Sequence, residues 1–180
     1  MNTMSHKLDS VLEGVGCHNA SFVKGSSGEK WGHVDPFKHE LGESVSVIET
    51  DEEGSFLQFT LTHDEFTEEE VSAKILHVTN CMNGIQNELT FMRNPSNGKL
   101  HAKRHFVTTG MHEKYIQDMV SDRYVKMKDI FEDCIWLCGW KIKNEGTDKE
   151  MFEALFEREH TREKRKNRRK GNDDFDPAYA

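Results

Sequence analysis

The sequence lacks the features that would place it in several large classes of protein. No run of residues approaches the roughly 18 consecutive apolar residues of a membrane span. Residues 1–6 lack the charged and apolar regions of a secretory signal. The four cysteines show none of the spacings of a disulfide framework, which is typical of reduced thiols. We therefore expect a cytoplasmic protein without a membrane partner.

Recognisable catalytic motifs are missing as well. Residues 25–30 are rich in glycine and serine, but they lack the Gly-Lys-Ser/Thr ending and the preceding buried strand of a phosphate-binding loop. The Gly-x-Ser-x-Gly motif of hydrolases does not occur. Since nothing supplies a nucleophile, a base and an orienting residue together, we predict no catalytic residues, no cofactor and no enzyme activity.

What the sequence does contain is a strong segregation of charge. The formal net charge is −8, from 24 basic and 32 acidic residues. Residues 158–170 carry eight Lys or Arg against two Glu, so the rest of the chain holds sixteen basic and thirty acidic residues, a net of −14. Residues 43–70 contain ten acidic residues and no Lys or Arg. Such asymmetry bears on the choice of partner rather than on the fold.

Hydrophobic periodicity predicts two β-hairpins, over 44–62 and 85–107, each followed by a helix, over 67–82 and 112–138. The first helix opens with a capping box at Thr67 and Glu70, and Gly139 is expected to end the second. The fold class is α+β, in the order ββαββα, with one antiparallel sheet and the helices on one face. One apolar side of the sheet is expected from Val45, Val47, Leu57, Phe59, Leu61, Leu89, Phe91 and Phe106.

The chain is expected to divide into four parts. Residues 1–42 hold an N-terminal helix (3–13) and then an irregular segment over 17–42, rich in glycine, serine and histidine. Residues 43–140 form the α+β core. Residues 141–160 form a C-terminal helix, and residues 161–180 form a disordered charged tail.

The order of these elements resembles the YbjN-like family, whose fold is that of the type III secretion chaperones. The matching residues are Asn80 and Asn83 at the end of a helix, the Asn97-Gly98 turn of the hairpin, and the long helix that follows. The resemblance covers about residues 3–138. It implies a non-enzymatic protein-binding domain, often dimeric, and the family supplies no catalytic residues to carry over.

Ten histidines and four cysteines raise the question of a metal site. His33-x-Asp35-x3-His39 is the best candidate, because imidazole and carboxylate could meet an ion within one loop. Such loose spacing is common by chance, so exposed polar residues are the favoured interpretation. Cys134 and Cys138 lie one helical turn apart on an apolar stripe, where we expect buried thiols. The sequence therefore predicts no metal ligands.

The C-terminal helix supplies the predicted binding residues. It opens with a capping box at Thr147 and Glu150, and its apolar face carries Phe152, Leu155 and Phe156. We expect this face to dock another polypeptide or to form a homodimer. The leading prediction is a chaperone- or adaptor-like protein.

The basic segment that follows leaves three alternatives open. It could bind nucleic acid, in which case its cations would contact phosphates with an affinity that falls steeply in salt. It could instead lie against the acidic region 43–70 of the same or another chain, or end as a solvated helix. The residues concerned are Arg158, Arg162, Lys164, Arg165, Lys166, Arg168, Arg169 and Lys170.

Overall fold

The structure is a computed structural model, which describes part of the 180 residues. The described residues are 15, 23–24, 30–39, 42–51, 54–64, 72–94 and 97–173, without the side chains of 23–24, 30–31, 33–35 and 165–173. The predicted helix over 3–13 and the predicted capping box at Thr67 and Glu70 lie outside these residues.

The described strands form a single antiparallel sheet in the order β1-β2-β3-β4-β6-β5. Its strands are β1 (Val23–Lys24), β2 (Lys30–His39), β3 (Gly42–Thr50), β4 (Phe56–His63), β5 (Thr90–Arg93) and β6 (Leu100–Val107). The helices are α2 (Ser72–Ile85), α3 (Glu113–Lys143) and α4 (Asp148–Asp173). This arrangement confirms the predicted α+β class with one antiparallel sheet.

Strand β2 corrects the expectation of irregular structure over 17–42. It is ten residues long and pairs with β3 along most of its length. The register shifts between Val34 and Phe37, where Pro36 offers no N–H to a neighbouring strand. This break interrupts the alternation of side chains, so the period of two that reveals a strand is not visible in the sequence.

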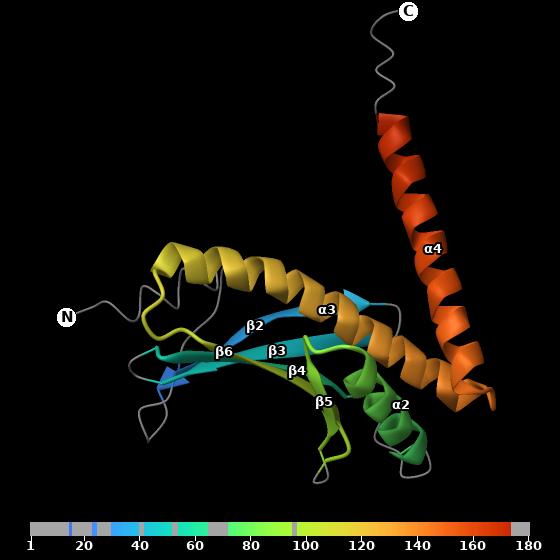
Figure 1. Cartoon of the computed structure of the whole chain (residues 1–180), viewed down its shortest axis with the longest axis horizontal. Helices are drawn as coiled ribbons and strands as arrows, with labels where there is room; N and C mark the ends of the chain where they lie inside the picture. The colour runs from blue at the N-terminus through green and yellow to red at the C-terminus, as the bar shows by residue number, and fades with distance from the viewer. Residues whose placement is uncertain are drawn as a thin grey trace, which may run out of the picture.

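Helix α3 lies across one face of the sheet, and α2 lies beside β5 at one end (Figure 1). Several aromatic rings meet in the core between the sheet and these helices. Phe131 of α3 stacks on Phe91 of β5 with ring centroids 6.2 Å apart, and Tyr124 lies 5.6 Å from Phe59 of β4. Most of the apolar stripe of α3 is buried. Burial of apolar surface between such layers is the main source of stability of the fold.

The predicted facing of β3 is wrong. Val45 and Val47 were expected on the apolar side, yet both are half-buried on the opposite face of the sheet. The register with β4 places the alternate residues of β3 beneath α3. These inward residues are Ser44, Ser46, Ile48 and Thr50.

Hydrogen bonds explain why serines can occupy the inner face. The Tyr124 hydroxyl donates to Ser46 Oγ over 2.8 Å, and both side chains are buried. Ser44 Oγ lies 3.2 Å from His63 Nδ1 and 2.9 Å from His39 Nε2. Buried polar groups are tolerated when they have partners. We call these hydrogen-bonded side chains on the inner face of the sheet the polar seam, and they take the place of the apolar contacts that valines would have made.

The second hairpin begins later than predicted, because α2 continues to Ile85 and β5 starts only at Thr90. Asn83 joins the two elements. Its side-chain oxygen accepts from the Phe91 N–H over 2.8 Å, and its side-chain amide donates to the Phe91 carbonyl over 2.9 Å. The second Asn of the Asn-x-x-Asn pair therefore supports the outermost strand, while Asn80 is exposed.

Gly139 does not end the long helix. Helix α3 runs four residues further, and Asn144 caps it by donating its backbone N–H and its side-chain amide to the Trp140 carbonyl. Gly146, just beyond the end of α3, is required for close packing, because a Cβ there would lie 2.5 Å from the Trp140 ring. A short connection, 144–147, then leads directly into α4.

The polar seam gives a prediction for stability. Tyr124→Phe leaves the Ser46 hydroxyl buried without its donor, and we expect a loss of about 1–2 kcal/mol in the free energy of unfolding. The double variant with Ser46→Ala should cost less than the sum of the two single changes, since each removes the same bond. Urea unfolding measures all three. Tyr115→Phe, at a tyrosine 61% exposed on the same helix, is the matched control, and full additivity would contradict the prediction.

Candidate functional site

Helix α4 starts at the predicted capping box. Glu150 accepts from the backbone N–H of Thr147 over 2.7 Å, while Thr147 Oγ1 accepts from the backbone N–H of Glu150 over 3.3 Å. The Thr147 backbone N–H and the Thr147 hydroxyl both donate to the Glu150 carboxylate, and these two bonds lower its pKa. This reciprocal pair confirms the predicted start of α4.

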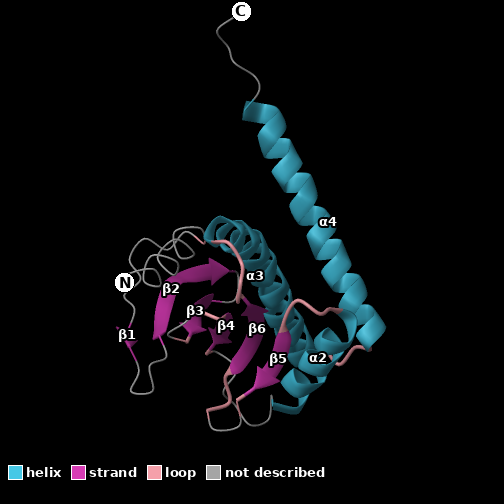
Figure 2. Cartoon of the chain, turned by 60° about the vertical axis from the view of Figure 1, so that its left-hand side comes forward, coloured by secondary structure: helices cyan, strands magenta, loops and turns pink. Residues whose placement is uncertain are grey.

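The first turns of α4 contact α3, and the rest of the helix leads away from the body of the molecule (Figures 1 and 2). The prediction of a disordered tail over 161–180 is therefore wrong for 161–173, which are helical. Arg, Lys and Glu are good helix formers, and Arg162 at the start of this segment pairs with Glu159 three residues earlier on the helix. Residues 174–180 lie outside the described part of the chain.

The three predicted partner-binding residues do not share one surface. Leu155 is half-buried and packs against the core beside the fully buried Met151. Phe156, by contrast, is 75% exposed, and Phe152 is half-buried next to it. A shallow hollow of about 440 Å³ runs along this side of α4, and we call it the α4 hollow. It is lined by Lys149, Phe152, Glu153, Phe156 and Glu157.

Two of the predicted phosphate-binding cations instead hold α4 against α3. The Arg158 side chain is only 10% exposed, and its guanidinium lies 3.1 Å from both Glu132 and Asp133. It also lies 5.3 Å from the centre of the Trp136 ring, in a cation–π contact. Arg162 pairs with Glu132 as well. These contacts reduce the number of cations in the basic segment that are available to a phosphate backbone.

The remaining members of the basic segment lie further along α4. Lys164 is exposed, and the side chains of 165–170 lie outside the described residues. By sequence this stretch contains five further Lys or Arg, on a part of the helix that stands away from the sheet (Figure 2). The far half of α4 is therefore a basic helical arm.

Burial at the α3–α4 contact shifts one titration strongly. Removal from water and the nearby charge of Glu159 raise the pKa of Asp133 to about 6. The Arg158 guanidinium acts in the opposite direction, but it does not cancel the cost of burial. Near neutral pH, keeping the Asp133 carboxylate ionised therefore lowers the stability of the folded state.

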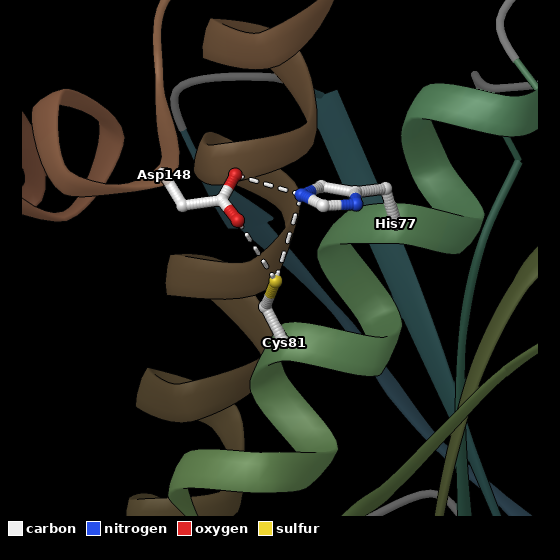
Figure 3. Close-up of side chains that lie close together, drawn as sticks. All are labelled: His77, Cys81 and Asp148. Carbon is white, nitrogen blue, oxygen red and sulfur yellow. Dashed lines mark hydrogen bonds and ion pairs between the residues drawn. The ribbon is translucent and has the colours of Figure 1, made fainter.

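A cluster that sequence analysis missed lies at the base of α4 (Figure 3). His77 Nε2 is 2.7 Å from Asp148 Oδ1 and 3.7 Å from Cys81 Sγ, and Cys81 Sγ is 3.9 Å from Asp148 Oδ2. The spacing of His77 and Cys81, one helical turn apart on α2, was a visible signal. Asp148 lies sixty-seven residues beyond Cys81 in the sequence, and only the fold brings it to them.

This cluster does not have the geometry of a cysteine–histidine–carboxylate relay. In such a relay the nucleophile and the carboxylate use different ring nitrogens, whereas Nε2 of His77 faces both Cys81 and Asp148. Partial burial, followed by the charge of Asp148, also raises the pKa of the Cys81 thiol. A protonated thiol is a poor nucleophile, so the arrangement is not suited to nucleophilic catalysis.

The metal candidates considered from sequence remain apart from this cluster. Cys134 and Cys138 are fully buried, as expected, and burial raises the pKa of the Cys134 thiol well above its usual range. His39 bonds to Ser44 in the polar seam, while the side chains of His33 and Asp35 lie outside the described residues.

Comparisons with protein-family models, with curated proteins and with solved structures give no match to this chain. The resemblance to the YbjN-like family stays a prediction. None of the helices in the described ranges combines the length and the hydropathy needed to cross a membrane.

The raised pKa of Asp133 gives a prediction with a definite sign. An aspartate in the unfolded chain loses its proton near pH 4, whereas Asp133 in the folded chain keeps its proton up to about pH 6. The contribution of Asp133 to stability therefore falls as the pH rises through this window. Asp133→Asn cannot titrate, so it should gain stability relative to the wild type between about pH 4 and 6 and level off above.

Urea unfolding at several pH values from 4.5 to 7.5 measures this difference. Asp129→Asn, at an exposed position one turn earlier on α3, is the matched control. An equal trend in both variants, or a gain for Asp133→Asn toward low pH, would contradict the assignment.

Proposed function

We propose that this chain is a non-enzymatic, chaperone- or adaptor-like protein that binds another polypeptide along helix α4. The observation that carries the proposal is the exposure of Phe156 on a helix that leads away from the body (Figure 1). A phenylalanine 75% exposed beside the half-buried Phe152 is an unfavourable use of aromatic surface unless a partner covers it.

The chemistry of α4 defines the kind of partner. Its near half offers the apolar α4 hollow, with Phe152 and Phe156 one helical turn apart, and its far half carries the basic arm. A partner helix that places apolar side chains at the hollow and acidic residues beyond them would match both halves. This is the helix-on-helix mode of peptide recognition, in which a few apolar anchors carry the energy and charges set the orientation.

Two further considerations support this proposal. The resemblance to the YbjN-like family implies protein binding, and the cluster at the base of α4 does not suit nucleophilic catalysis. We also propose the cytoplasm as the compartment, since the three cysteines in the described ranges are free thiols.

A second copy of the chain is another occupant with suitable chemistry. Residues 43–70 carry ten acidic residues and no cation, and a basic arm could meet them across a dimer. Within one chain the far half of α4 points away from strands β3 and β4 (Figures 1 and 2), which favours a contact between two copies over the same-chain contact considered from sequence.

Nucleic-acid binding is the second candidate function. The position of the basic arm, clear of the sheet, favours it, because a duplex could approach the helix from most sides. The pairing of Arg158 and Arg162 with Glu132 weakens it. It leaves at most six cations of the segment for phosphate contacts.

The polypeptide proposal is tested at Phe156. A photo-crosslinking residue at position 156, compared with one at position 125, should capture a distinct partner from the native cell. The captured protein is then purified and titrated with each variant. Phe156→Asp should weaken its binding at least tenfold, because a buried aromatic anchor is worth about 2 kcal/mol or more.

Val125→Asp is the matched control, since Val125 is 57% exposed on α3, away from α4. It should bind like the wild type. Light scattering of the purified chain identifies the other occupant: a dimer that Phe156→Asp converts to monomer would show that a second copy covers α4. Equal capture at both positions, with unchanged affinity and oligomeric state in Phe156→Asp, would contradict the proposal.

The nucleic-acid alternative predicts a specific salt dependence. With six contacting cations, the slope of log affinity against log salt on mixed-sequence duplex DNA should be about −5, whereas eight contacts would give about −7. Lys164→Gln should make the slope shallower by about 0.9, and Arg162→Gln should leave it unchanged because that side chain pairs with Glu132. Full-length protein without DNA affinity at low salt would remove this alternative.

A further inference from the structure

We infer that His77, Cys81 and Asp148 form a binding site for a transition-metal ion such as Zn²⁺, and that the ion would fasten α2 to the first residue of α4 (Figure 3). The inference concerns a different part of the surface from the α4 hollow, and it does not depend on the proposed partner. It rests on the convergence of three ligand atoms of different chemistry from two helices.

Two of the three distances are close to those of a tetrahedral ion. With the usual Zn–N, Zn–S and Zn–O bond lengths, neighbouring ligands of a tetrahedral zinc lie about 3.4–3.6 Å apart. Here the sulfur of Cys81 lies 3.7 Å from His77 Nε2 and 3.9 Å from Asp148 Oδ2. The nitrogen–oxygen distance of 2.7 Å is that of a hydrogen bond, and it would have to open by about 0.7 Å for an ion to replace the proton.

The direction of each side chain supports the same conclusion. His77 and Cys81 are one helical turn apart on α2, so both side chains project toward the start of α4. Asp148 turns one carboxylate oxygen toward the imidazole and the other toward the thiol. The three groups thus face a common point at the surface of the molecule.

The donor set selects the class of ion. An imidazole, a thiol and a carboxylate suit zinc and cobalt, whereas magnesium and calcium require oxygen ligands. His77 and Asp148 are both nearly half exposed, which leaves water access to a fourth position. A three-ligand site with one water is a normal coordination for zinc.

One charge opposes the ion. Lys141 places its ammonium 3.4 Å from Asp148 Oδ1 and also donates to the Gly146 carbonyl over 2.8 Å. A cation bound at Asp148 would experience this repulsion at short range. The site should therefore bind metal more weakly than one without the lysine, so removal of the lysine should tighten binding.

The experiment uses the full chain without a histidine tag, titrated with Co²⁺ and followed by optical absorption. We expect one Co²⁺ per chain and a thiolate-to-cobalt charge-transfer band. Cys81→Ser should abolish the band, and His77→Gln should weaken binding at least tenfold, because the loss of a ligand costs no less than the 10- to 100-fold of an outer-shell change. Cys17→Ser, at a cysteine elsewhere in the chain, is the matched control and should keep the band.

Lys141→Met separates metal binding from a loss of folding. It removes the opposing ammonium, so it should tighten Co²⁺ binding several-fold, a gain that a damaged fold cannot produce. Amide hydrogen exchange tests whether the ion fastens α2 to α4. Zn²⁺ should slow exchange over 77–81 and 144–151 in the wild type and not in Cys81→Ser. A missing band, a band that survives Cys81→Ser, equal competition by Mg²⁺, or weaker binding in Lys141→Met would each overturn the inference.

Discussion

Burial of helix α3 against the inner face of the sheet is the interaction on which the other parts of the molecule depend. Its apolar stripe, from Ile116 to Cys138, covers the sheet along most of its length. The same helix carries Tyr124, whose hydroxyl donates to Ser46 in the polar seam, and it also carries the carboxylates that hold α4. Because one helix serves both the core and the arm, the position of α4 is tied to the packing of the whole domain.

The attachment of α4 combines interactions of different strength. Met151 is completely buried, and burial of such a side chain contributes about 1.5–3 kcal/mol. Exposed ion pairs add little, but Arg158 is largely removed from water and contacts two carboxylates and an indole ring. We infer that apolar contact decides where α4 is attached, and that Arg158 limits the angle at which it leaves. Helix α4 therefore presents Phe156 from a defined attachment to α3.

The molecule carries its distinctive chemistry near the start of α4. The α4 hollow lies on one side of the helix, and the cluster of His77, Cys81 and Asp148 lies where its first residue meets α2. A metal ion in that cluster and a polypeptide in the hollow would both act on the same short segment, 148–157. An ion that stiffens the base would lower the entropic cost of ordering α4 when a partner binds, since less freedom is left to lose.

The sequence by itself determined the class of the fold, because periods of two and of 3.6 are local properties of the chain. The two hairpins, the long helix and the capping box at Thr147 could all be predicted in this way. It did not reveal strand β2, whose alternation is broken at Pro36, nor the inward facing of Ser44 and Ser46. A serine is expected at the surface when only the sequence is considered, because its hydrogen-bond partners across the core are not visible there.

Only the tertiary structure decided which charges neutralise one another and which ligands meet. Arg158 belongs to a predominantly basic stretch of sequence, yet the packing of α4 places it against carboxylates of α3. Likewise His77 and Cys81 carry a local signal, but Asp148 joins them only because α3 returns the chain to α2. Contacts between residues far apart in sequence depend on how whole elements pack, and no local period of the chain encodes that packing.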